Sequence, residues 1–228
     1  EKERRLLLAR DRFGKKPLYY AEAGGCLLFA SEPKALLEHP LCPRELDPAS
    51  LSRYLALEYV PAPHAIFAGM RKLPGGHRLT WENGQTVVTR WWDLAFSPES
   101  PERSDAEYAE ELREQLRAAV RRRLLSDVPL GAFLSGGIDS SSVVAMMAEA
   151  GAVNTFSIGF AEESFDESAH ARRVAEHFGT DHSEHVFTPA DMLDAIPAVA
   201  DVLDEPLGDA SILPTYLLSR FTREHVTV

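Results

Sequence analysis

Seven consecutive residues have the composition of a turn that binds phosphate. They read Ser-Gly-Gly-Ile-Asp-Ser-Ser, from Ser135 to Ser141. The apolar run at 130–134 predicts a strand before them, and residues 139–150 predict a helix after them. The two adjacent glycines allow the backbone to approach an anion closely and to take positive φ. The N-terminus of the helix would present free N–H groups and its positive dipole end to the same anion.

The segment also carries an acidic residue, Asp139, whose charge would repel an anion. A cation between the carboxylate and the phosphates removes this conflict, and the Mg²⁺ that accompanies ATP is such a cation. The hydroxyls of Ser135, Ser140 and Ser141 add hydrogen-bond donors. We therefore expect ATP and Mg²⁺ as ligands, with Asp139 as the metal-binding and catalytic residue. The alternative is an ordinary Gly-Gly turn followed by helix caps, but the ordered strand, turn and helix favour a phosphate site.

The elements around this segment alternate between strand and helix. Strands are predicted at 155–160 and 185–187 and helices at 168–178 and 214–224, besides the two elements that flank the turn. This order predicts an open parallel sheet with right-handed crossovers. Three further elements are predicted: a helix at 105–124 that opens with a capping box at Ser104, a helix from Thr188 that is broken or kinked at Pro197, and a strand at 226–228.

The first part of the chain, residues 6–95, is predicted to consist mostly of short strands. Gly24-Gly25 and Asn83-Gly84 are two-residue hairpin signals between apolar runs. Short helices are predicted at 31–39 and at 48–59, the second with Asp47 as its N-cap. Polar residues, serine and proline at 98–104 predict a linker.

Composition restricts the class of protein. The chain has 228 residues, a net charge of −11 and two cysteines. The acidic balance argues against a general nucleic-acid binder, and the few cysteines favour a reducing cytoplasm. No apolar run is long enough to span a membrane. The chain starts without methionine and begins and ends in predicted strands, so we expect a fragment of a longer protein.

The string S-G-G-x-D-S at 135–140 resembles the loop of the pyrophosphate-loop ATPases, which form an adenylate and release pyrophosphate. That group includes asparagine synthetase, GMP synthetase and NAD synthetase. Other segments are similar to glutamine-hydrolysing asparagine synthetase in particular. They are RDRFGKKPLYY at 10–20, ASEPKAL at 30–36, PGGH at 74–77, SDVPLG at 126–131, and DEP with D-A-S at 204–211.

This resemblance implies an α/β fold in two parts. Residues 1–97 would be the C-terminal part of an Ntn-type glutaminase domain with αββα layers, also called a glutamine amidotransferase type 2 domain. Residues 105–228 would be the N-terminal part of an open parallel-sheet pyrophosphate-loop ATPase domain, similar to the adenine nucleotide alpha-hydrolases and truncated. The implied enzyme is a cytoplasmic carbon–nitrogen ligase. It converts aspartate to asparagine through a β-aspartyl-adenylate, with ammonia from glutamine.

The resemblance also implies the site residues and the partners. The phosphates and Mg²⁺ would be held by the loop residues Ser135, Gly136, Gly137, Asp139, Ser140 and Ser141. Leu134 and Ile158 would flank the adenosine. The substrate region would include Asp204, Glu205, Asp209 and Ser211. The expected partners are the small molecules ATP, aspartate and ammonia, without nucleic acid or membrane, and a homodimer is compatible with the resemblance.

Several family features are missing from these 228 residues. The N-terminal nucleophilic cysteine, the N-G-E and G-S-D glutamine-binding motifs, and the second phosphate segment S-G-x-G-x-D-E are absent. Cys26, in a predicted strand, is no substitute for the nucleophile. We therefore expect this chain alone to be inactive. The alternatives are a related amidotransferase that acts on a cell-envelope or natural-product carboxylate, in the manner of β-lactam synthetase, and a non-catalytic remnant that binds ATP.

Overall fold

The computed structural model describes residues 4–96, 103–160 and 166–228. The chain divides into two compact units. Unit 1 comprises Glu1–Pro98 together with Asp201–Asp209, and unit 2 comprises Glu99–Ala200 together with Ala210–Val228. Unit 1 therefore takes in a short segment that lies far along the sequence from the rest of it.

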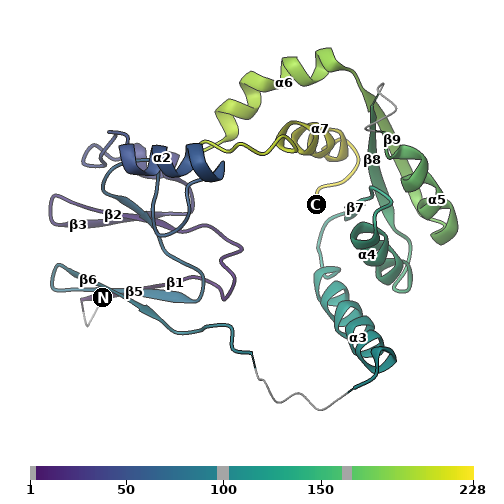
Figure 1. Ribbon diagram of the computed structural model, residues 1–228, viewed down its shortest axis with the longest axis horizontal. Coiled ribbons are helices and arrows are strands. Elements are labelled where there is room, and N and C mark those ends of the chain that lie inside the picture. The colour runs from purple at the N-terminus through teal and green to yellow at the C-terminus, as the bar shows by residue number, and fades with distance from the viewer. Residues whose placement is uncertain (1–3, 97–102, 161–165) are drawn as a thin grey trace. The chain divides into compact units, whose positions relative to one another are not determined.

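Unit 1 contains two antiparallel sheets with the strand orders β1-β5-β6 and β3-β2-β4 (Figure 1). The first sheet is formed by β1 (Arg5–Ala9), β5 (His77–Glu82) and β6 (Gln85–Arg90), and the second by β2 (Tyr19–Ala23), β3 (Cys26–Ala30) and β4 (Met70–Lys72). Both predicted hairpins are confirmed. Their turns take positive φ at both central positions, 57° and 76° at Gly24 and Gly25, and 52° and 76° at Asn83 and Gly84, as a two-residue hairpin with this twist requires.

Consecutive tyrosines on β2 serve the two faces of its sheet, because neighbouring side chains on a strand point in opposite directions. Tyr19 packs with Leu36 of helix α1 (Pro33–Leu37) and with Met70. Tyr20 packs with Leu79 of the other sheet and with Leu73. The two sheets thus share one core, and α1 covers the opposite side of the second sheet.

Helix α2 (Pro48–Leu57) begins as the sequence predicts. The Asp47 carboxylate accepts hydrogen bonds from the backbone N–H groups of Ala49 and Ser50, each at 3.2 Å. The helix ends at Leu57, before Glu58, which has a left-handed φ of 65°.

Unit 2 is built on a parallel sheet with the strand order β7-β8-β9, which confirms the predicted parallel pairing. Its elements are α3 (Asp105–Arg123), β7 (Gly131–Phe133), α4 (Ile138–Ala148), β8 (Asn154–Phe160), α5 (Ser168–Phe178), β9 (Asp181–Phe187), α6 (Pro189–Val202) and α7 (Ile212–Arg223). The predicted capping box at the start of α3 is present, with Ser104 and Glu107 bonded to each other's backbone N–H.

Helices cover both faces of this sheet (Figure 1). One core cluster joins Leu134 to Val144 of α4 and to Ala171 of α5. Another joins Phe187 of β9 to helices α6 and α7 through Ala195 and Leu217. Figure 1 shows α4 and α5 on one side of the sheet and α7 on the other. The chain is thus a mixed α/β protein with antiparallel sheets in one unit and a parallel sheet in the other.

Three sequence predictions differ from the structure. Strand β9 begins at Asp181 rather than His185. Helix α6 runs through Pro197 without the predicted break, with Ala195 and Val199 on either side of the proline buried in the core, and the alternative of a kink there stays a prediction. Residues 226–228 are not a strand. Instead, the N–H groups of Thr227 and Val228 both donate to the carbonyl of Pro129, at 3.2 Å each.

Within the described residues, no helix is both long enough and apolar enough to cross a membrane.

Candidate functional site

The candidate loop lies at the carboxyl end of β7, between that strand and α4. Leu134, the residue before the loop, is only 2 % exposed, and its N–H donates to the carbonyl of Phe156 on β8 at 2.8 Å. The strand end is therefore fixed to the centre of the sheet. In open parallel sheets, ligands bind beyond the carboxyl ends of strands, which is where this loop lies.

Hydrogen bonds between serines and backbone shape the loop. The hydroxyls of Ser135 and Ser140 lie 3.0 Å apart. The Ser135 hydroxyl also accepts the N–H of Gly137 at 3.3 Å, and the Ser140 hydroxyl donates to the Gly137 carbonyl at 3.2 Å. The hydroxyl of Ser141 is buried, and it has no partner in the described part of the chain. Of the three serines expected to contact phosphate, Ser135 and Ser140 thus lie within hydrogen-bonding distance of each other. The hydroxyl of Ser141 has no partner among the described residues.

The start of α4 provides the features that an anion with its metal needs. Gly137 is the N-cap, and no side chain of the described residues caps the helix. The first N–H groups of a helix have no partner within the helix, so they remain available to an anion. The Asp139 carboxylate is exposed and forms no ion pair with any described residue. A free carboxylate beside free N–H groups fits a magnesium-bound polyphosphate.

The two glycines of the loop have different environments. Gly136 has a φ of 80°, and a Cβ on it would lie 2.5 Å from the carbonyl carbon of His170 and 2.7 Å from the nitrogen of Ala171. Gly136 is therefore required by the contact with α5. A Cβ on Gly137 would have the Ser135 hydroxyl oxygen as its nearest neighbour, at 3.4 Å, and its φ is −70°. Gly137 thus has open space in front of it, where a phosphate can approach.

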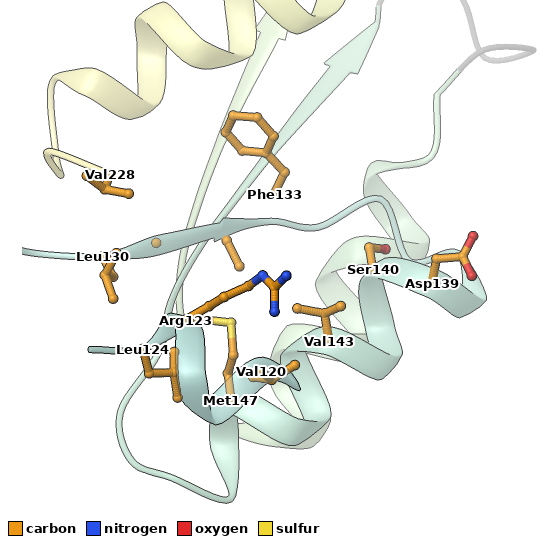
Figure 2. Close-up of a pocket in the computed structure, with 12 residues that line it drawn as sticks. Val120, Arg123, Leu124, Leu130, Phe133, Asp139, Ser140, Val143, Met147 and Val228 are labelled. Atoms are coloured by element: carbon orange, nitrogen blue, oxygen red, sulfur yellow. The ribbon is translucent and has the colours of Figure 1, made fainter. Parts of the chain in front are cut away.

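A pocket of about 450 Å³ lies beside the loop, between α3, β7 and α4 (Figure 2). Its lining is largely apolar and includes Val120, Val143 and Met147. Figure 2 shows the Asp139 carboxylate turned away from these side chains and from Arg123. Asp139 and Ser140 are nevertheless among the residues that line the pocket, so the loop borders it.

Two residues expected beside adenosine, Leu134 and Ile158, belong to different faces of the sheet. Leu134 packs toward α4 and α5. Ile158 is partly buried and packs against the cluster of Phe187 and Leu217 on the side of α6 and α7. Each of the two residues lies near the carboxyl end of a strand, but their side chains point to opposite faces of the sheet.

The four residues expected near the substrate are divided between the units. Asp204, Glu205 and Asp209 are in unit 1, whereas Ser211 is in unit 2. The Glu205 carboxylate lies 2.5 Å from the Lys72 ammonium, and Asp204 Oδ1 lies 3.5 Å from that of Lys34. These lysine partners could not be predicted from the sequence, because more than a hundred residues separate them from the carboxylates.

Strands β8 and β9 also carry a buried polar network centred on His182. Its Nδ1 lies 2.9 Å from the Thr155 hydroxyl, and its Nε2 lies 3.1 Å from the Ser157 hydroxyl. Both hydroxyl residues are buried, at 0 % and 3 % exposure. Burial lowers the pKa of His182 below its ordinary value, so the neutral ring is the favoured form in the fold.

At the start of α5, the N–H and hydroxyl of Ser168 hold the pKa of Asp166 below its usual range. Asp166 Oδ1 accepts that N–H at 3.1 Å, at the start of α5. This carboxylate therefore stabilises the helix that contacts Gly136.

Comparisons with protein families match the two parts of the chain to two different family models. Residues 111–228 match the family model described as asparagine synthase, and residues 1–92 match the glutamine amidotransferase domain. The two matched regions correspond to an antiparallel part and a parallel part that carries the phosphate-type loop. The chain belongs to the asparagine synthase family.

Three relatives illustrate the range of similarity. A putative glutamine-hydrolysing asparagine synthetase 2 from Methanocaldococcus jannaschii is 34 % identical, over 98 % of this chain and 44 % of that protein. Glutamine-hydrolysing asparagine synthetase 1 from Bacillus subtilis is 33 % identical, over 96 % of this chain and 35 % of that protein. The amidase chyE from Penicillium rubens is 35 % identical, over 77 % of this chain and 28 % of that protein. The chain therefore spans less than half the length of these relatives.

Proposed function

We propose that this chain belongs to a glutamine-dependent asparagine synthetase, and that the loop at 135–141 binds the polyphosphate of ATP. The observation that carries the proposal is the start of α4, which has no side-chain cap among the described residues and is preceded by the open backbone of Gly137. Free N–H groups at a helix N-terminus attract phosphate. Membership of the asparagine synthase family supports ATP as the source of that phosphate.

The residues of the loop have distinct roles in this proposal. Gly137 and the first N–H groups of α4 bind phosphate oxygens, while Ser135, Ser140 and Ser141 contribute hydroxyls. Asp139 holds Mg²⁺, which would neutralise charge on the pyrophosphate leaving group. Gly136 keeps the loop in contact with α5. Leu134 and Ile158 would place the adenosine through their positions near the ends of β7 and β8.

We propose the same division into parts that the sequence suggested. Residues 1–97 would be the C-terminal part of an Ntn-type glutaminase domain, and 105–228 the start of a pyrophosphate-loop ATPase domain. The matches at 1–92 and 111–228 support this proposal. In the complete enzyme, ATP would activate aspartate as an adenylate, and ammonia released from glutamine would attack the activated carbon. Such an enzyme would act in the cytoplasm on small molecules.

The test is aspartate-dependent exchange of labelled pyrophosphate into ATP by the complete gene product that carries this sequence. We expect exchange with Mg²⁺ and aspartate, and loss of exchange when either is omitted. Exchange measures formation of the adenylate directly and does not require glutamine hydrolysis. An enzyme that binds ATP but shows no exchange with any carboxylate would refute the proposal.

A second candidate is an amidotransferase that acts on a different carboxylate. The observation that favours it is the similarity to proteins named amidases, which extends over 77 % and 79 % of this chain. The same exchange assay separates the two candidates. Exchange with a panel of other carboxylates, in the absence of any exchange with aspartate, would select the second.

A further inference from the structure

The segment at 201–209 is held in unit 1 at both ends. At its start, the Lys34 ammonium donates to the backbone carbonyls of Asp201 and Val202, at 2.8 and 2.9 Å. Near its end, the Gly208 N–H donates to the Glu58 carbonyl at 2.7 Å. A Cβ on Gly208 would lie 2.7 Å from the Glu58 Cβ, so this approach requires glycine. The connection between α6 and α7 is thus part of the fold of unit 1.

Glu205 is the central contact of this segment. Its Oε1 accepts the N–H of Ile66 at 2.7 Å, and its Oε2 accepts the Tyr19 hydroxyl at 3.1 Å. The Lys72 ammonium lies 2.5 Å from Oε2. The side chains of Glu205 and Lys72 are only 10 % and 14 % exposed. The carboxylate is therefore enclosed by donors from β2, from β4 and from the loop between α2 and β4.

The partners of Glu205 also make contacts with one another and with the neighbouring backbone. The Lys72 ammonium also donates to the carbonyl of Val60 and lies 5.8 Å from the centre of the Tyr19 ring. Burial and the negative charge of Glu205 both raise the pKa of Tyr19, so its hydroxyl remains a donor. A buried ion pair of this kind is weak evidence for added stability, since an apolar pair of similar size is often equally stable. The ion pair nevertheless requires the two side chains to stay together, because each buried charge is costly without the other.

The docked segment connects two helices that pack on the parallel sheet. Ala195 of α6 and Leu217 of α7 share one core cluster with Phe187 of β9. The connection between these helices is therefore tied to unit 1 by Glu205 and to the sheet of unit 2 through its own flanking helices. A change at Glu205 can reach the sheet through covalent chain and packed helices alone.

We propose that Glu205 is a positioning residue for the coupling of glutamine hydrolysis to amide synthesis. By pairing with Lys72, it docks the α6–α7 connection in unit 1. This inference rests on the proposed function, in which the first part of the chain belongs to the glutaminase domain and the second to the ATP-dependent domain. This role replaces the one expected from the sequence: both carboxylate oxygens of Glu205 already have partners within unit 1, so the residue holds the segment and does not contact substrate.

The experiment uses the complete gene product and four variants. Glu205→Gln keeps an acceptor for Ile66 and removes the charge, Lys72→Met removes the other charge, and the double variant removes both. Asp93→Asn is the matched control, since it alters another ion pair of unit 1, with Arg90 at 2.6 Å, in which the Asp93 side chain is 63 % exposed. Three quantities are measured: product amide formed per glutamate released, amide synthesis from ammonium, and thermal stability.

We expect Glu205→Gln and the double variant to form at least about twofold less amide per glutamate released, within the range of single-residue coupling effects. Synthesis from ammonium should stay near the wild-type rate, and Asp93→Asn should couple normally. The double variant should recover thermal stability that either single variant loses, because no buried charge is left without a partner. Recovery of stability without recovery of coupling separates positioning from folding.

Two results would overturn the inference alone: a wild-type ratio of amide to glutamate in both Glu205→Gln and the double variant, or a parallel fall of ammonium-dependent and glutamine-dependent synthesis. If Glu205→Gln does not fold, the double variant decides the question. A wild-type enzyme that makes no amide from ammonium and ATP would instead overturn the proposed function, and the inference with it.

Discussion

The backbone of Gly136 lies against that of His170, and a Cβ on Gly136 would be 2.5 Å from the His170 carbonyl carbon. Because Gly136 also has a φ of 80°, this position excludes side chains for two independent reasons. Its neighbour Gly137 has a φ of −70° and open space around it. The two glycines of the loop at 135–141 therefore have different functions: Gly136 is needed for the fold, and Gly137 belongs to the proposed site.

We predict opposite behaviour for alanine at these positions. Gly136→Ala should lower the free energy of unfolding by at least about 2 kcal/mol, because the left-handed backbone and the contact with α5 are both disfavoured. Gly137→Ala should leave stability nearly unchanged and weaken ATP binding, because its methyl group would stand where the phosphate approaches. Denaturant unfolding and nucleotide titration measure the two effects. Equal stability of Gly136→Ala and wild type would contradict the assignment.

Asp139→Asn should lower aspartate-dependent pyrophosphate exchange by at least about tenfold, equal to 1.4 kcal/mol, because the amide is a poor ligand for Mg²⁺. The unfolding free energy should be unchanged, since the carboxylate is exposed and unpaired among the described residues. Glutamine hydrolysis should continue. Asp127→Asn is the control, an exposed aspartate outside the loop in the same unit. If both variants kept normal exchange, Asp139 would not hold the metal.

Local signals in the sequence predicted local structure well. The glycine turns at 24–25 and 83–84, the Asp47 cap and the Ser104 capping box each act within a few residues, so their partners are visible in the sequence. The phosphate-type loop is of the same kind, since its strand, turn and helix are consecutive.

Features that depend on distant partners were missed. The first residues of strand β9 are polar, so their sequence does not resemble a buried strand. One of them, His182, is accommodated by Thr155 and Ser157, which lie on another strand. The different surroundings of Gly136 and Gly137 depend on the position of α5. The segment at 201–209 begins with the last two residues of α6, whose other residues belong to the second unit, yet it packs in the first unit. Only the folded chain places Glu205 beside Lys72.

Substitution of Ser141 should change ATP affinity without changing the stability of the fold. Its hydroxyl is buried without a partner among the described residues, so Ser141→Ala removes no hydrogen bond from the ligand-free protein. We expect stability within about 0.5 kcal/mol of wild type. If the hydroxyl donates to bound phosphate, ATP affinity should fall roughly fivefold, equal to about 1 kcal/mol. Ser140→Ala is the contrast, because it loses its contacts with Ser135 and Gly137 and should reduce both quantities. Unchanged affinity in Ser141→Ala would remove this serine from the site.

His182 should make the protein less stable in mild acid. Burial lowers its pKa in the fold from an ordinary value of 6.5, with Glu184 at 4.0 Å opposing the shift and Arg172 adding to it. Below pH 6.5 the unfolded chain takes up the proton before the folded chain does, which draws the equilibrium toward unfolding. The stability that the neutral ring provides is therefore complete above pH 6.5 and is lost as the pH falls toward the folded pKa.

The measurement is the midpoint of urea unfolding at a series of pH values from about 5 to about 7.5, across the usual titration range of histidine. Wild type should lose stability over this range more steeply than His182→Gln, in which no proton is taken up at this position. His177→Gln, which alters an exposed histidine of α5, should retain the wild-type slope. If His182→Gln and wild type showed the same slope, the acid sensitivity would arise from other groups, and the neutral His182 network would not be its cause.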